Sequence, residues 1–126
     1  MDYYKEIPGI PKEVVDKALD NYLCDFEEYG VIRPCPSMKA FFQPEPYEGM
    51  QEIIDYLKKG KLSDTSGGVA YDYFNPEKIS GENRSMSDGE FNWSHTLPYY
   101  IETYNLRLLE HHEKRLLEKI RAKKTE

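Results

Sequence analysis

The side chains best able to move protons or attack a substrate at neutral pH are three histidines and two cysteines, spread over 126 residues. His95 follows the single tryptophan by two positions. A catalytic set of His95 with Asp72 and Asp88 can be drawn, because all three flank predicted strands. Nothing in their spacing fixes a nucleophile, a base and an orienting group together. Acidic residues are common in this chain, so such sets arise by chance, and we predict no catalytic residue and no enzyme.

The remaining chemical motifs are incomplete. Cys35 lies between prolines without a neighbouring histidine, so it is predicted to be a plain thiol. The run 65–68, Thr-Ser-Gly-Gly, lacks the Lys-Ser/Thr ending of a phosphate-binding P-loop, and it predicts a loop. The run 111–113, His-His-Glu, is not a zinc-binding HExxH, and adjacent helical residues point about 100° apart. It predicts a solvated helix face, with no metal and no cofactor.

Composition and cysteine usage indicate a compartment. Mean hydropathy is −0.78, and no apolar run approaches the roughly 18 residues of a membrane span. The first residues lack a basic segment followed by an apolar one, so no secretory signal is expected. Two cysteines, Cys24 and Cys35, are then more often reduced thiols than a disulfide. We expect a cytoplasmic protein without a membrane association.

Charge is unevenly distributed along the chain. Residues 107–126 carry seven Lys or Arg and four Glu, which gives +3, whereas residues 1–106 carry ten basic and nineteen acidic side chains, which gives −9. An acidic body disfavours nucleic-acid binding, which requires clustered basic residues. It is compatible with a basic protein partner, although an acidic charge alone is also ordinary for a cytosolic protein.

The segment 87–108 organises the predicted fold. Asp88-Gly89 is a strong turn signal, and 90–93 alternates polar and apolar residues as a short strand does. Ser94 is predicted to cap a helix over 94–104, in which Pro98 falls near the first turn. One face of that helix is apolar, and the tryptophan before it is predicted to be core: Trp93, Leu97, Tyr100, Ile101 and Tyr104. Tyr99, on the other side, is a candidate for a partner surface.

Flanking segments supply the other elements. Helices are predicted over about 11–28 with a stop at Gly30, over 47–59 with a stop at Gly60, and over about 107–122. A strand is predicted over 69–74, and the polar stretch 75–88 is predicted to link it to the strand at 91–93 as an antiparallel pair or a meander. A short edge strand is predicted over 38–42. Residues 1–10 are expected to form an extended arm, and 121–126 a frayed tail. The prediction is one α+β domain, with helices packed on a short antiparallel sheet.

The second half of the chain resembles small bacterial immunity and immunity-like proteins encoded beside toxins. The resemblance runs from about 53 to 108 and rests on IIDYLKKGK, on a strand with Asp72, and on a pattern in the central segment. That pattern consists of Asp88, Gly89, Trp93, Leu97, Tyr99, Tyr100, Ile101 and Tyr104. This chain departs from it in having Ser94 where proline follows the tryptophan, and Leu108-Leu109 where Leu-Pro follows the last tyrosine segment.

The resemblance implies a cytoplasmic protein that binds a secreted toxin and occludes its active site, which needs no catalytic residue. The candidate partner-binding residues are Tyr99, Asp72, Asp88 and Glu90, and the expected partner is a basic toxin domain. One alternative is a self-associating interaction module, dimerising through the helix that contains Leu109–Ile120. A second alternative is a small enzyme with a site near Asp72, Asp88 and His95.

Overall fold

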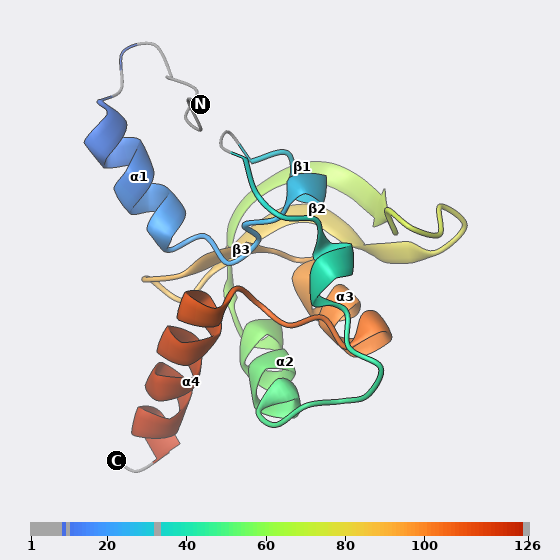
Figure 1. Ribbon diagram of the computed structural model, residues 1–126. Helices are drawn as coiled ribbons and strands as arrows, with labels where there is room; N and C mark the ends of the chain where they lie inside the picture. The colour runs from blue at the N-terminus through green and yellow to red at the C-terminus, as the bar shows by residue number, and fades with distance from the viewer. Residues whose placement is uncertain (1–8, 10, 32–33, 125–126) are drawn as a thin grey trace.

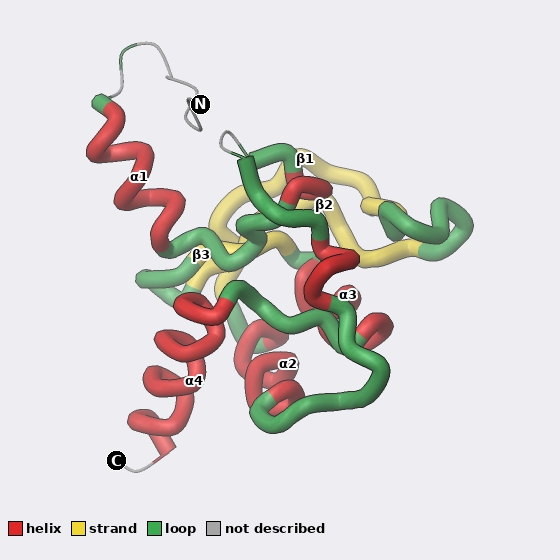
Figure 2. The backbone as a smooth tube through the Cα atoms, viewed as in Figure 1, coloured by secondary structure: helices red, strands yellow, loops and turns green. Residues whose placement is uncertain are grey.

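The computed structural model describes residues 9, 11–31 and 34–124, and it shows an α+β fold, as predicted. Helices and a sheet of three antiparallel strands form separate layers (Figures 1 and 2). In chain order the elements are α1 (Lys12–Asp20), the 3-10 helices η1 (Glu27–Tyr29) and η2 (Met38–Phe41), α2 (Met50–Lys58), β1 (Lys61–Tyr71), β2 (Ile79–Ser87), β3 (Asn92–Ser94), α3 (Leu97–Tyr104) and α4 (Glu110–Lys124).

The sheet is a meander in the order β1-β2-β3, and it is larger than the sequence predicted. Strand β1 runs through the segment 65–68 that was predicted to be a loop, and it ends at Tyr71 instead of residue 74. Strand β2 occupies much of the stretch predicted to be polar connection, so 69–71 pairs with β2 and not with 91–93. Strand β1 is exposed at every residue except Ala70, and β2 is buried only at Ser80 and Met86, so neither strand shows the apolar alternation by which half-buried strands are recognised.

A bulge divides β1 into two stretches. The register passes from Thr65 opposite Arg84 to Val69 opposite Glu82, which leaves three residues of β1 facing one residue of β2. Two of the three are Gly67 and Gly68, at φ values of 79° and 77°, a conformation that glycine adopts without strain. The glycine run therefore marks a bulge in a strand, whereas the sequence suggested a loop.

Helix α1 ends at Asp20, eight residues before the predicted end. The chain then pairs with β3: the Leu23 amide donates to the Asn92 carbonyl at 2.9 Å, and the Asn92 amide donates to the Asn21 carbonyl at 2.8 Å. Sheet pairing overrides the helical spacing of the apolar residues that follow. Gly30 does end a helix, but that helix is η1. The edge strand predicted over 38–42 is instead the 3-10 helix η2.

Helices α2 and α3 form largely as predicted. All four apolar residues of the α2 face are buried: Met50, Ile53, Ile54 and Leu57. Helix α3 begins at Leu97, later than expected, because Ser94 belongs to β3 and its hydroxyl accepts the Thr96 amide at 3.2 Å, outside the helix. In Figure 1, α2 lies between α3 and α4 beneath the sheet, and α2 contacts both helices.

Helix α4 begins three residues later than predicted and continues to Lys124, so residues 121–124 are helical and not frayed. The rest of the predicted tail, and the predicted extended arm except Gly9, lie outside the described residues. His112 is buried, and its Nε2 bonds the Asp20 carbonyl at 3.1 Å. The predicted solvated face at 111–113 is therefore wrong at its central residue, because α4 packs there against the end of α1.

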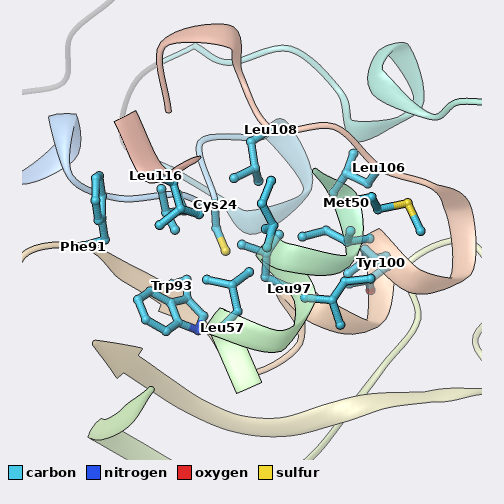
Figure 3. Packing of buried hydrophobic residues seen from close by; sticks show 14 of the residues in the cluster. Cys24, Met50, Leu57, Phe91, Trp93, Leu97, Tyr100, Leu106, Leu108 and Leu116 are labelled. Atoms are coloured by element: carbon cyan, nitrogen blue, oxygen red, sulfur yellow. The ribbon is translucent and has the colours of Figure 1, made fainter. Parts of the chain in front are cut away.

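The hydrophobic core gathers side chains from α2, α3, α4, β2, β3 and the loops between them (Figure 3). Trp93, Leu97, Tyr100 and Ile101 are each completely buried, which confirms the predicted core face. Tyr104 is half-buried, and its ring stacks on Phe42 with centroids 4.6 Å apart. The central segment thus organises the fold because its residues face the sheet, α2 and the loop after η2 at once.

Candidate functional site

Asp72, a predicted partner-binding residue, is instead an internal hydrogen-bond acceptor. It is 2% exposed, and its carboxylate accepts the Phe74 amide at 2.7 Å, the Tyr99 hydroxyl at 2.8 Å and the Tyr104 hydroxyl at 2.5 Å. Burial alone would raise the pKa of Asp72, but the hydrogen bonds from Tyr104, Phe74 and Tyr99 hold it below the ordinary value. Asp72 ties the end of β1 to α3, and its carboxylate does not face solvent.

Tyr99 is half-buried, and it is not presented freely from the far side of its helix. Its hydroxyl is engaged by Asp72, and its ring meets Tyr100 edge to face, with centroids 5.2 Å apart. Tyr99 also lines a cavity beside Trp93. The predicted contact of Tyr99 with a partner stays a prediction, and only the exposed part of its side chain is available for it.

Asp88 fixes the turn between β2 and β3. One carboxylate oxygen accepts the backbone amides of Glu90 and Phe91 at 2.9 and 2.7 Å, as the turn signal predicted. The other accepts the Tyr56 hydroxyl at 2.5 Å and the Lys119 ammonium at 2.9 Å. Burial opposes ionisation of Asp88, but these hydrogen bonds, that from Tyr56 first, lower its pKa to about 2. The carboxylate is thereby committed to contacts within the chain.

Glu90 is exposed but also engaged, since it receives Lys119 at 3.0 Å and Arg115 at 3.5 Å. Farther along α4, Arg121 pairs with Glu52 of α2 at 3.1 Å. The basic segment that is separate in the sequence therefore lies against acidic side chains of the body. Some of the acidic side chains that the sequence suggested for binding a basic partner are therefore paired within the chain.

The predicted chemical groups are held in separate places. His95 accepts the Glu82 amide at Nδ1 and contacts Arg84, whereas Asp72 and Asp88 have the partners given above. No hydrogen bond joins any two of these three residues in the part of the chain described. Cys24 and Cys35 do not form a disulfide, and Cys35 Sγ donates to Asp25 at 2.9 Å. Among residues 9, 11–31 and 34–124, no three His, Cys, Asp or Glu side chains are grouped to hold a metal.

Exposed apolar side chains gather on the β1–β2 hairpin, and the sequence did not single them out. We define the hairpin patch as Val69, Tyr71 and Ile79, which are 43%, 54% and 55% exposed. Tyr71 and Ile79 are opposite one another in the register, and Val69 lies two residues before Tyr71, so the three share one face. The partial alternation over 69–74 was the available signal, but it predicts only a strand and not which of its side chains stay exposed.

The hairpin also presents an open strand edge. Strand β1 is the terminal strand of the sheet, and every one of its residues except Ala70 is exposed. The opposite edge of the sheet differs, because Tyr22 bridges Asn92 of β3 there. Figure 1 shows β1 arching along the outside of the sheet. Unpaired edges are sites where other chains can add, and the bulge at 66–68 limits regular pairing to the stretches on either side.

No helix among the described residues is long and apolar enough to cross a membrane. Comparison of the chain with protein-family models, with curated proteins and with solved structures found no match.

Proposed function

We propose that this chain is a protein-binding module, and that it acts as an inhibitor that covers the active site of a partner. The observation that carries the proposal is the concentration of exposed apolar side chains on one hairpin. Of the six large exposed hydrophobic residues among those described, five lie between positions 62 and 79, and Val14 is the sixth. Contiguous exposed apolar surface is characteristic of protein interaction sites, whereas single exposed residues are ordinary.

The chemistry of the partner is inferred from charge. The whole chain has a net charge of −6, which disfavours association with a second copy and favours a basic protein. Asp64 on β1 and Glu77 in the hairpin connection are exposed close to the patch in sequence. We expect a basic partner to contact the apolar hairpin patch and to pair with one or both of these carboxylates. A toxin that acts on nucleic acid has such a surface, which agrees with the resemblance to immunity proteins.

An inhibitor that covers an active site needs a stable binding surface and no catalytic residues. The groups that could have been catalytic are used to hold the fold: Asp72 binds two tyrosines, and Asp88 joins α2, α4 and the β2–β3 turn. These contacts fix the sheet on the helices, so the hairpin is presented from a rigid base. Rigid presentation lowers the entropic cost of binding.

The experiment is affinity capture from the cells that produce the chain, followed by work with the purified partner. The wild type is compared with Tyr71→Ser and Ile79→Ser, and Val14→Ser is the matched control, because Val14 is equally exposed but lies on α1. We expect one stoichiometric basic partner, a loss of affinity of about 30-fold or more in the hairpin variants, and no change in Val14→Ser. Each exposed substitution should leave stability within about 0.5 kcal/mol.

The purified partner must also lose its activity when the chain binds, and recover it with Tyr71→Ser. A partner that remains active in the complex would refute inhibition while leaving protein binding intact. Equal loss of affinity in Val14→Ser and Tyr71→Ser would refute the hairpin as the binding surface. Affinity should fall as salt rises, because the partner is basic.

Self-association through α4 loses its basis in this fold. Leu116 and Ile120 are buried in the core, and Leu109 and Leu117 pack against it. The apolar face of that helix is therefore already used within the chain. A second copy remains a competing occupant of the hairpin patch, and a mass in solution that doubles with concentration in the wild type but not in Tyr71→Ser would favour it over the basic partner.

A further inference from the structure

A cavity beside Trp93 is not used by the proposed function. It has a volume of about 500 Å³ and lies between the end of α2, the strands β1 and β2, and the start of α3. Its apolar walls include Leu57, Met86, Trp93 and Pro98. Small-molecule sites are typically of this size, mostly apolar, with a few convergent polar groups.

The polar groups of this cavity include a histidine whose tautomer is set by the backbone. His95 Nδ1 accepts the Glu82 amide at 3.0 Å, so in the neutral ring the proton is on Nε2. The ring is held closely against β2: a Cβ on Gly81 would lie 2.9 Å from Nδ1, so only glycine leaves room. The imidazole therefore holds its Nε2–H donor in a fixed direction, toward the side chain of Arg84.

That donor faces another donor. Arg84 Nη2 lies 3.3 Å from His95 Nε2, and a guanidinium nitrogen carries hydrogens only. Two N–H groups with no acceptor between them are an unsatisfied pair, which an oxygen atom placed against both would satisfy with a charge-assisted hydrogen bond. The indole Nε1 of Trp93 is a further buried donor, and it has no hydrogen-bond partner among the described residues. In Figure 3 it lies on the side of the ring toward Leu57, another cavity-lining residue.

The local charge selects among anions. Arg84 Nε lies 2.9 Å from a Glu82 carboxylate oxygen, an ion pair whose geometry does not make a hydrogen bond, and at the rim Lys58 is paired with Glu102 at 3.2 Å. Each of the two cations is therefore already matched by one carboxylate, and a monoanion adds less unbalanced negative charge to the cavity than a dianion such as phosphate does. A monoanion with two acceptor oxygens and an apolar body matches both the donors and the walls. We infer that the cavity binds a carboxylate attached to an apolar group, through the Arg84–His95 donor pair.

The same chemistry is available from a free organic acid and from the C-terminal residue of a protein that ends in an apolar side chain. The first arm of the experiment titrates 4-phenylbutyrate, with 4-phenylbutyramide as the uncharged control. The second arm titrates a short peptide that ends in Phe, as the free acid and as the amide. Binding is followed by two-dimensional NMR of the folded chain, in which the single tryptophan gives one indole resonance.

We expect saturable shifts of the Trp93 indole and His95 resonances with the acids, and at least tenfold weaker binding of the amides. Arg84→Gln should weaken binding of the acids by about tenfold, and Arg107→Gln, which alters an arginine paired with Glu113 elsewhere, should not. Tighter binding of the peptide acid would assign the ligand to a protein C-terminus, and tighter binding of phenylbutyrate would assign it to a free acid.

Three results would overturn the inference: equal binding of acid and amide, unchanged binding in Arg84→Gln, or no shift with either acid at about 10 mM. His95→Gln provides a second test, because it keeps a donor without fixing it against Gly81 and should also weaken the acids. The inference does not rest on the proposed function, since the hairpin variants Tyr71→Ser and Ile79→Ser should bind the acids as the wild type does.

Discussion

Replacing Gly60 with alanine tests how closely the end of α2 packs on the core. Helix α2 ends at Lys58 with Lys59 as its C-cap, so Gly60 stands at C′ as predicted, but its φ is not positive and a left-handed conformation is not the reason for glycine there. Its hydrogen atoms lie against the indole instead: an added Cβ would be 2.3 Å from Cζ2 and 3.0 Å from Cη2 of Trp93. Carbon atoms pack favourably at about 3.5–4.0 Å, so the methyl group overlaps the ring by more than 1 Å.

The size of the effect follows from two opposing terms. Trp93 is completely buried, so the ring has little space to move, and overpacking of this kind costs about 1–3 kcal/mol. Alanine also restricts the unfolded chain, which offsets about 0.4–1 kcal/mol. We expect Gly60→Ala to reduce the free energy of unfolding by about 1–2 kcal/mol and to lower Tm by about 4–8 °C.

The assay is a double-mutant cycle with Trp93→Phe, measured by urea unfolding and far-ultraviolet circular dichroism. Phenylalanine lacks the benzo ring atoms that the alanine methyl meets, so the cost of Gly60→Ala should largely disappear in that background. Gly30→Ala is the control: Gly30 has φ 67° and no atom near an added Cβ, so its cost comes from backbone strain and should be equal in both backgrounds. An equal cost of Gly60→Ala in the two backgrounds would refute the packing argument.

Two further predictions concern buried groups. Burial, with a smaller contribution from His111, lowers the pKa of His112 to about 4. The unfolded chain then binds a proton below about 6.5 that the folded chain does not. Stability should therefore fall by roughly 2–3 kcal/mol as pH falls from 6.5 to 4, and His112→Leu should flatten this dependence in urea unfolding across that range. Burial raises the pKa of Cys24 to about 12, so a thiol reagent should modify Cys35 alone in the native protein and both cysteines in denaturant; rapid native labelling of Cys24 would contradict its burial.

Some elements were determined by local sequence. The apolar face of α2, the core face of α3 and the Asp88-Gly89 turn each follow from the spacing of a few neighbouring residues, and each forms where it was predicted. Their signals are strong because the period of the apolar residues matches the period of the backbone, or because a side chain bonds its own turn. The α+β class followed from these elements together.

Other features were decided by contacts between distant segments. The helical spacing after Asp20 is overridden because Asn21 and Leu23 pair with Asn92. Strands β1 and β2 have exposed side chains on both faces, so only their pairing with each other makes them strands.

The candidate site shows the same division. The sequence predicted that Asp72 and Asp88 bind a partner. The residue type alone does not distinguish a carboxylate on the surface from one that is hydrogen-bonded by tyrosines inside the fold. The tertiary structure turned both inward by bringing Tyr99, Tyr104 and Tyr56 to them. It left the hairpin exposed instead, because helices cover the body of the sheet and nothing in the described chain covers Tyr71 and Ile79. Composition limited which chemistry was available, and packing decided which side chains face solvent.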